Sequence, residues 1–429
     1  MKVAMFQQAP YRFLPEDFEQ RGYASCVTPP YRELADAAGI TATLHGMLDE
    51  LVLGARSGFD GVVLTEHSQA AYDITPNPSL PAAVLAHILR TEDIDAALIV
   101  LGRSLGKTRE PLKIAEEYAT LDVLSGGRLI AGFPVGLSYD ANINQGIPGV
   151  DTRGRFREGY ELLRRAWAAD EAFPFNGRYS QYAHVNVWPR PVQEPQPPLW
   201  FPGSGNPGTM DWVLEQDAAF VLLTWFGVRM GGAGIFDRFW EMCEAKGKEA
   251  NPHRIAVVQV CAVAETDERA EAEYGPYLER AFRHGLGSIP QHFFLQPGYV
   301  PMRGLQGMLR STADPGIAGR LHEVTFRELA DAGCVIVGSP ATVRERLEAE
   351  CREMRVGNLL AMLHMGEMPH ELAEKSIRLF ADEVLPHVQG MWERDGFEHR
   401  WWPGDPVGRA SGTPRRTSAE PPFSGVGGA

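Results

Sequence analysis

The feature that most constrains the fold is a repeated alternation of short apolar segments with longer segments of helical periodicity. In the second repeat, residues 44–57 carry apolar side chains at helical spacing, and the apolar run Val62–Leu64 follows them. A run that is apolar on both faces is typical of a strand buried inside a parallel sheet. The pattern predicts eight main strands, nearly all followed by a helix, which begin at Lys2, Phe59, Ile94, Arg128, Leu199, Ala219, Ile255 and Asn358.

Eight βα units that close on themselves form a (β/α)8 TIM barrel of about 250 residues plus insertions. The 429 residues, 44% of them hydrophobic, can form one large domain or two ordinary ones. We predict one barrel domain over residues 1–402, with insertions near 9–40, 173–198 and 285–330, and a disordered tail at 403–429. An open doubly wound sheet is the alternative, and it is disfavoured because no GxGxxG motif follows the first strand.

Charge and cysteine content narrow the class of protein. The net charge is −14 and no basic run stands out, which argues against a nucleic-acid partner. The five cysteines lack the spacing of a zinc site or a disulfide framework, so we expect reduced thiols in a cytoplasmic protein. The N-terminal apolar stretch is too short for a signal peptide, and no run approaches the roughly 18 apolar residues that span a bilayer.

Polar and glycine residues follow the predicted strands at the carboxyl end of the barrel, where such folds carry their chemistry. His67 follows the second strand, and an imidazole there can move a proton near neutral pH, although Glu66 and His67 could simply cap the strand. Gly203-Ser204-Gly205 precedes a helix whose N-terminal N–H groups suit a phosphate, although an ordinary tight turn has the same appearance. Trp225 could wall a planar ring or cap the core.

Three segments resemble the bacterial luciferase-like family of flavin-dependent monooxygenases. The most specific is PLKIAEEYATLDVLSGGRLIAGF, residues 111–133, which is similar to the family's hallmark helix, Ser-Gly-Gly-Arg turn and strand. TEH after the second strand and WPRPVQEPQPPLWFPGSG, residues 188–205, follow the family's order and spacing. The resemblance covers most of residues 1–388. It implies a barrel that binds reduced FMN, activates O2 as a flavin C4a-hydroperoxide and oxygenates a small organic molecule.

The same resemblance implies partners and site residues. A separate NAD(P)H-dependent flavin reductase would supply the reduced FMN, and the enzyme would be a homodimer. Aromatic and methionine residues near the barrel rim suggest a mostly apolar substrate. The family's catalytic role falls on His67, and its cofactor-binding positions fall on or near Ser104, Val135, Gly136, Gly203, Ser204, Gly205 and Trp225.

Two positions depart from the family pattern. Many relatives have a second histidine where this chain has Ser68, and many have Arg-Gly where it has Val135-Gly136. The second difference would remove a cation from the FMN phosphate. Four residues could replace that cation, and the sequence does not choose among them: Arg103, Lys107, Arg153 and Arg155.

Two other functions stay open. One is hydride transfer with the deazaflavin F420 on the same fold, and the other is a catalytically silent flavin-binding barrel. We also hypothesise that the aromatic residues 10–31 and the Gly- and Pro-rich residues 285–316 cover the mouth of the barrel. A covered mouth would exclude water and so suppress side reactions of a reactive intermediate.

Overall fold

The computed structural model describes residues 1–15, 17–23, 27–223, 232–285, 289, 293, 298–299 and 321–406. Its centre is a ring of parallel strands, each predicted from the sequence: β1 (Lys2–Gln7), β2 (Gly61–Leu64), β3 (Ala97–Val100), β4 (Leu129–Gly132), β7 (Leu199–Gly203), β8 (Ala219–Leu223), β9 (Ile255–Val263) and β11 (Asn358–Met362). Neighbours pair in this order, and β11 pairs with β1 to close the ring. The predicted (β/α)8 barrel is therefore confirmed.

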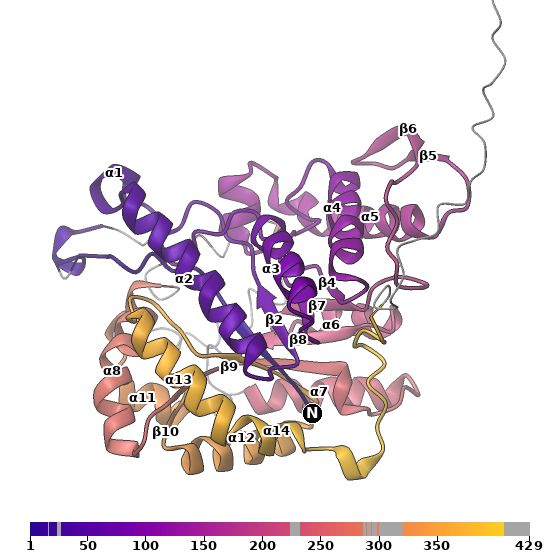
Figure 1. Ribbon diagram of the computed structural model, residues 1–429. Coiled ribbons are helices and arrows are strands. Elements are labelled where there is room, and N and C mark those ends of the chain that lie inside the picture. Colours follow the sequence, from indigo (N-terminus) through magenta and orange to yellow (C-terminus); the bar gives the residue numbers. More distant parts are fainter. Residues whose placement is uncertain are drawn as a thin grey trace, which may run out of the picture.

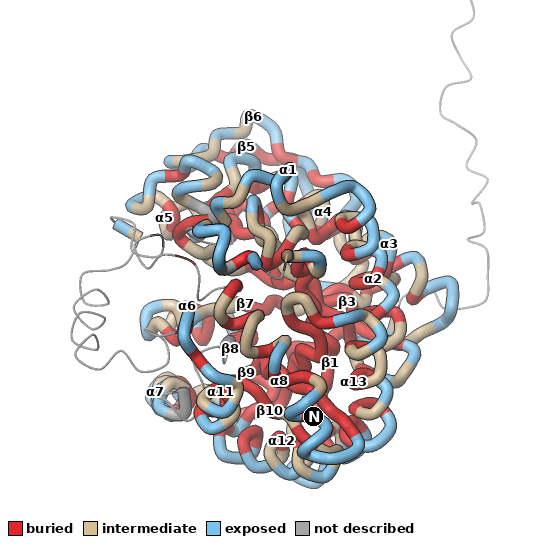
Figure 2. Tube along the Cα trace, turned by 90° about the vertical axis from the view of Figure 1, so that its left-hand side faces the viewer, coloured by how far each residue is buried: buried red, intermediate tan, exposed pale blue. Residues whose placement is uncertain are grey.

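Alternate strand residues face two separate cores. In β2, Val63 packs inside the barrel with Phe6 and Ile99, whereas Val62 and Leu64 pack outward against the helices. Every residue of β2, β3 and β4 is buried, which explains why these segments are apolar on both faces. The buried strands fill the centre of Figure 2, and exposed segments lie around them.

The helices surround the barrel (Figure 1). They are α1 (Tyr31–Leu34), α2 (Ala37–Arg56), α3 (Ser79–Thr91), α4 (Pro111–Ser125), α5 (Gly149–Ala168), α6 (Pro207–Glu215), α7 (Gly232–Ala245), α8 (Asp267–His284), α11 (Phe326–Ala332), α12 (Pro340–Met354), α13 (His370–Glu383) and α14 (Leu385–Gln389). As predicted, α4 begins with a proline and ends at Gly126, whose φ of +67° is the left-handed helix cap.

Two elements differ from the sequence prediction. Helix α2 starts at Ala37, because the Asp36 side chain accepts the Gly39 N–H at 2.7 Å, so the irregular N-terminal segment ends before residue 40. The short apolar segment at 334–338 forms a ninth strand, β10 (Val335–Gly338), outside the ring. It pairs with the carboxyl half of β9, which is long enough to pair with β8 through its first residues and with β10 through its last.

The insertion predicted near residues 173–198 contains a hairpin of β5 (Phe173–Asn176) and β6 (Gln181–Val185), which pair antiparallel at the edge of the molecule in Figure 1. At the amino end of the strands, Trp401 and Trp402 pack into the inner core, and the Trp200 indole donates to the Trp401 carbonyl at 2.8 Å. Most of the predicted tail, residues 407–429, lies outside the described residues.

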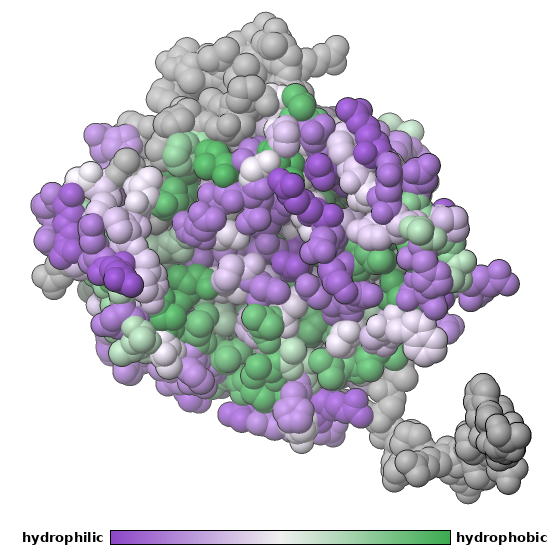
Figure 3. Space-filling view, turned by 90° about the horizontal axis from the view of Figure 1, so that it is seen from above, coloured by the Kyte–Doolittle hydropathy of each residue, from purple (hydrophilic) through white to green (hydrophobic). Residues whose placement is uncertain are grey.

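The surface of the described part carries scattered apolar side chains. On the face in Figure 3, apolar groups in green lie apart from one another with polar groups in purple between them. The large apolar side chains with the greatest exposure include Trp188, Leu80 and Val150, at 80%, 70% and 70%, and they come from separate parts of the chain. Within the ranges given above, no helix is both long and apolar enough to cross a membrane.

Candidate functional site

The structure brings most of the predicted site residues to the carboxyl end of the barrel. His67 follows β2, Ser104 follows β3, and Val135 and Gly136 follow β4. The Ser104 hydroxyl donates to the Val135 carbonyl at 2.6 Å, so the loops after β3 and β4 are joined directly. Gly203 ends β7, with Ser204 and Gly205 next in the chain. Trp225 lies outside the described residues.

Glu66 ties the end of β2 to the loop after β3. Its carboxylate accepts the Arg103 backbone N–H at 2.6 Å and pairs with the Lys107 ammonium at 2.8 Å. The side chains of Glu66 and Lys107 are only 5% and 6% exposed. Because both ends of this ion pair are buried, Glu66 is a positioning residue that fixes the backbone next to His67.

His67 lies between two buried tyrosines. Its Nδ1 is 2.9 Å from the Tyr72 hydroxyl and 3.5 Å from the hydroxyl of Tyr139, the first residue of the π-helix η2 (Tyr139–Asn144). The neighbouring Asp73 is fully buried, and desolvation raises the pKa of its carboxyl while the His67 charge and the Thr65 and Thr75 hydrogen bonds oppose that rise. The sequence analysis missed both tyrosines, because aromatic residues in strand-end loops are common in ordinary cores.

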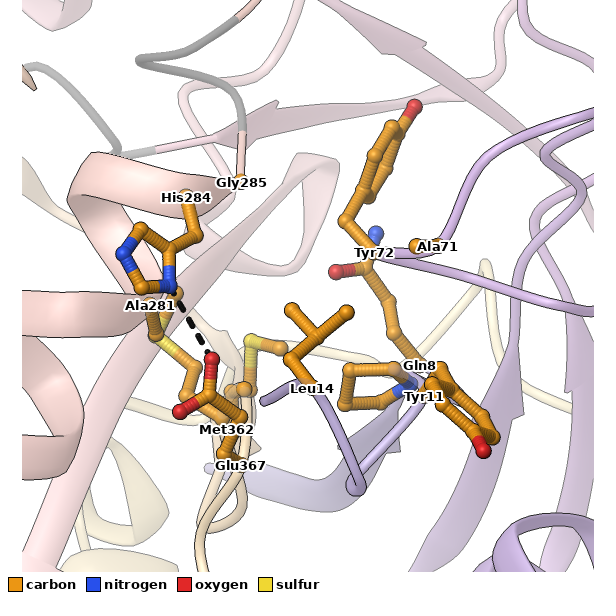
Figure 4. Close-up of a pocket in the computed structure, with 13 residues that line it drawn as sticks. Gln8, Tyr11, Leu14, Ala71, Tyr72, Ala281, His284, Gly285, Met362 and Glu367 are labelled. Atoms are coloured by element: carbon orange, nitrogen blue, oxygen red, sulfur yellow. Dashed lines mark hydrogen bonds and ion pairs between the residues drawn. The ribbon is translucent and has the colours of Figure 1, made fainter. Parts of the chain in front are cut away.

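A cavity adjoins this histidine. Tyr72 lines it, together with apolar residues of the N-terminal segment, of the end of β11 and of the loop after it, among them Leu14, Met362 and Met365. Figure 4 shows Leu14 pointing into the space between Tyr72 and a polar pair on the opposite side. That pair is His284 and Glu367, whose Nδ1 and Oε1 atoms are 3.0 Å apart. The cavity is therefore mostly apolar, with one polar pair on the side opposite Tyr72.

Residues from both predicted covering segments pack over this region. One apolar cluster contains Phe18 from the N-terminal segment, Ile289 from the late insertion, and the two tyrosines that flank His67, Tyr72 and Tyr139. Phe18 also packs against the His284 ring, with centroids 5.1 Å apart. Tyr11 and Leu14 of the first segment and Gly285 of the second line the cavity itself.

The turn after β7 has the features of an anion site. Gly205 has a φ of +81°, and a Cβ there would lie 2.7 Å from the Ile235 side chain, so glycine is required. Ser204 is exposed, and α6 begins just beyond it with Asn206 as its N-cap. The Asn206 side chain accepts the first free N–H groups of α6, which leaves Ser204 and the backbone of the turn to meet a ligand.

The structure distinguishes the four cations that the sequence left open. Arg103 pairs with Glu117 at 2.9 Å and Lys107 pairs with Glu66, so both are already neutralised. Arg155 lies over the Tyr179 ring at 5.0 Å and faces the β5–β6 hairpin. Arg153 has no carboxylate partner within the described ranges, and its Nε is buried without a hydrogen bond.

Helix geometry puts Arg153 on the side of α5 that faces α6. The Arg157 guanidinium lies over the Trp212 ring at 5.5 Å, so this side of α5 faces α6. Arg153 lies one helical turn before Arg157, and Gly208, at the start of α6, lies one turn before Trp212. The glycine turn, the Ser204 hydroxyl and a guanidinium without a carboxylate partner in the described part of the chain fit a phosphate group such as that of FMN.

Neither metal nor disulfide chemistry is indicated by the described residues. No group of three or more His, Cys, Asp or Glu side chains lies close enough together there to hold a metal ion. Cys243, Cys261, Cys334 and Cys351 are free and buried, and Cys26 lies outside the described residues.

Comparison with known proteins places this geometry in context. Residues 25–357 match the family described as luciferase-like monooxygenase. The chain is 29% identical over 181 residues to the oxygenase component of flavin-dependent trigonelline monooxygenase from Acinetobacter baylyi, covering 41% of this chain and 48% of that protein. It is 22% identical over 384 residues to limonene 1,2-monooxygenase from Rhodococcus erythropolis, covering 88% and 89%.

Solved structures share the fold. The FMN complex of the oxygenating constituent of 3,6-diketocamphane monooxygenase from Pseudomonas putida aligns with a TM-score of 0.67 at 20% identity, over 90% of this chain and 98% of that one. An F420-dependent secondary alcohol dehydrogenase aligns with a TM-score of 0.61 at 14% identity, over 90% and 98%. The family match extends over most of the barrel and confirms the resemblance seen in the sequence: the chain belongs to the luciferase-like monooxygenase family.

Proposed function

We propose that this chain is the oxygenase component of a two-component flavin-dependent monooxygenase, which uses reduced FMN and O2 to oxygenate a small, mostly apolar organic molecule. The observation that carries this proposal is the gathering of His67, an apolar cavity and a phosphate-type turn at one end of a single barrel. The family match supports it, as does the similarity to an oxygenase component in Acinetobacter baylyi.

In this proposal, the chain's own residues bind the cofactor and control protons and water. Gly203, Ser204, Gly205 and Arg153 would hold the FMN phosphate, and the joined loops of Ser104 and Val135–Gly136 would border its ring system. Reduced FMN supplies the electrons that activate O2. His67 would exchange a proton with a reacting group, and such general acid–base help is worth about 10²–10⁴-fold. The cluster around Phe18 would exclude water.

The cavity beside Tyr72 is the proposed chamber for the organic substrate. Leu14, Met362 and Met365 give it apolar walls that suit a hydrocarbon body. The His284–Glu367 pair offers one polar contact at the far end from Tyr72. A substrate with an apolar body and a single polar group matches this arrangement.

The deciding experiment supplies reduced cofactors separately. The purified chain is mixed with FMN, a flavin reductase and NADH, or with reduced F420, and O2 uptake and hydrogen peroxide are recorded with a panel of small apolar substrates. Substrate-dependent O2 uptake with FMN and not with F420 is the expected result. Reduction of a substrate in step with oxidation of the reduced F420 and without O2 would establish the second candidate, F420-dependent hydride transfer; F420 is the cofactor of an alcohol dehydrogenase that shares this fold.

A His67→Gln variant separates an enzyme from a silent flavin-binding barrel. If the chain is the proposed monooxygenase, this variant binds reduced FMN normally but loses substrate oxidation. Oxidation at the wild-type rate would mean that His67 has no catalytic role.

Two further expectations accompany the proposal. One is a cytoplasmic location, and the other is a homodimer that light scattering would detect as twice the mass of one chain.

A further inference from the structure

His67 is held through one ring nitrogen by buried phenols. Nδ1 lies 2.9 Å from the Tyr72 hydroxyl and 3.5 Å from the Tyr139 hydroxyl. The two tyrosines are 9% and 1% exposed, so bulk water does not compete freely for these contacts. An imidazole nitrogen carries either one lone pair or one proton, and the shorter distance identifies Tyr72 as its main partner.

Relative acidity sets the direction of this hydrogen bond. A phenol ordinarily has a pKa near 10 and an imidazolium one near 6.5, so phenol O–H to imidazole N is the favoured arrangement at neutral pH. In that arrangement the Tyr72 hydroxyl donates and Nδ1 accepts. The proton of the neutral ring must then be on Nε2.

We propose that Tyr72 is a positioning residue that fixes neutral His67 as the Nε2–H tautomer. In this tautomer the Nε2–H of neutral His67 is a hydrogen-bond donor, and the lone pair on Nδ1 is occupied by the Tyr72 hydroxyl. Tyr72 also lines the cavity with its ring, so the residue that sets the tautomer is in contact with the proposed substrate chamber. The catalytic meaning of this donor rests on the proposed function, whereas the tautomer itself does not.

The charged groups around the ring act differently from the phenols. Asp73 affects His67 through its charge, while its carboxylate accepts hydrogen bonds from the Thr65 hydroxyl and the Thr75 N–H. Glu66 is paired with Lys107 and with the Arg103 backbone. A nearby carboxylate favours the imidazolium, whereas a hydroxyl that donates to Nδ1 favours the neutral ring. Removing that hydroxyl should therefore raise the pKa of His67.

Nitrogen NMR of the flavin-free protein tests the proposal. Histidine is labelled with 15N, the long-range 1H–15N spectrum is recorded across pH 5 to 9, and the His67 signals are assigned by their loss in His67→Gln. In the wild type at high pH, we expect an unprotonated Nδ1 and a protonated Nε2. In Tyr72→Phe, we expect mixed tautomers and a pKa higher by about one unit.

Tyr11→Phe is the matched control, because Tyr11 lines the same cavity and its hydroxyl lies against Gly39 of α2. It should leave the His67 signals unchanged, and thermal melting will show that both variants fold. A protonated Nδ1 in the wild type, or an unchanged tautomer and pKa in Tyr72→Phe, would overturn the proposal. Because no flavin is present, such a result would leave the proposed monooxygenase function standing, and failure of FMN-dependent oxygenation would leave the tautomer result standing.

Discussion

At the scale of single residues, the ion pair of Glu66 and Lys107 should matter more to stability than an exposed ion pair, because both side chains are buried. Replacing Lys107 with Met removes the ammonium and leaves a carboxylate that is 5% exposed. We expect the free energy of unfolding to fall by roughly 3 kcal/mol, because the buried carboxylate loses its nearer cation and keeps only the Arg103 guanidinium, at 3.7 Å. Urea denaturation measures this. The double variant Lys107→Met, Glu66→Gln should recover part of the loss, and a double variant no more stable than the single one would refute this account.

Arg153 is the residue-scale test of the phosphate site. Since Arg153 lacks a carboxylate partner within the described part of the chain and lies one turn before Arg157 on the side of α5 that faces α6, Arg153→Met should weaken FMN binding by about 10–100-fold. Binding of riboflavin, which has no phosphate, should change little. Fluorescence titration with both flavins measures the ratio.

Arg157→Met is the control for that measurement, because Arg157 is one helical turn away and lies over the Trp212 ring. It should keep the preference for FMN over riboflavin. Equal weakening of FMN and riboflavin by Arg153→Met would mean that the residue shapes the site without meeting the phosphate.

The sequence predicted His67 and the glycine turn as site residues but did not predict their surroundings. Four cations were open because their partners are far away in the chain: Glu66 reaches Lys107, and Tyr179 faces Arg155 only after the hairpin has folded back. The same reason hid Tyr139, which is 72 residues from His67. Short-range patterns predict residue types at strand ends, whereas pairing across loops requires the closed barrel.

At the scale of elements, Asp122 of α4 holds the extended segment that leads into β7. Its buried carboxylate accepts the N–H groups of Val192 and Gln193 and the Gln193 side-chain amide, at 2.7–3.0 Å. Asp122→Ala would leave these donors without a partner, so we expect a loss of roughly 2–4 kcal/mol in the free energy of unfolding. Glu116→Ala on the same helix removes only an exposed pair with Lys113 and should cost less than about 1 kcal/mol. Similar losses in the two variants would contradict this role.

Strand and helix positions were largely predictable because burial on both faces leaves a strong apolar signal. The two elements that were predicted wrongly depend on local features that the apolar pattern does not reveal. The start of α2 depends on a single capping side chain, Asp36, in a segment that otherwise looks irregular. The ninth strand depends on the length of β9, which offers β10 a free edge beyond its pairing with β8.

At the scale of the whole molecule, acid should destabilise the end of the barrel opposite the site. His253 is 2% exposed, its ring lies 3.7 Å from that of His399, and burial followed by the His399 charge lowers the pKa of His253 to about 3. The folded state therefore keeps His253 neutral, whereas the unfolded state protonates it below about pH 6.5. Its stabilising contribution is complete above pH 6.5 and is lost progressively as the pH falls toward 3.

We expect this group alone to remove roughly 3 kcal/mol of stability between pH 7 and pH 4. Urea denaturation at the two pH values measures the loss. His253→Asn should reduce the pH dependence, because asparagine can still donate to the Gly357 carbonyl that His253 contacts at 3.0 Å but has no proton to gain. His184→Asn, on exposed β6, should leave it unchanged. A pH dependence that is equal in both variants would rule out His253 as its source.

The pairing of β1 with β11 joins residues 2–6 to residues 358–362. During synthesis, β1 therefore cannot pair with β11 until nearly the whole barrel has left the ribosome. Until then, a nascent or truncated chain carries two unpaired edges made of apolar strands, which are templates for aggregation. Production of this protein in cells should accordingly benefit from slow translation and from chaperones that shield strand edges.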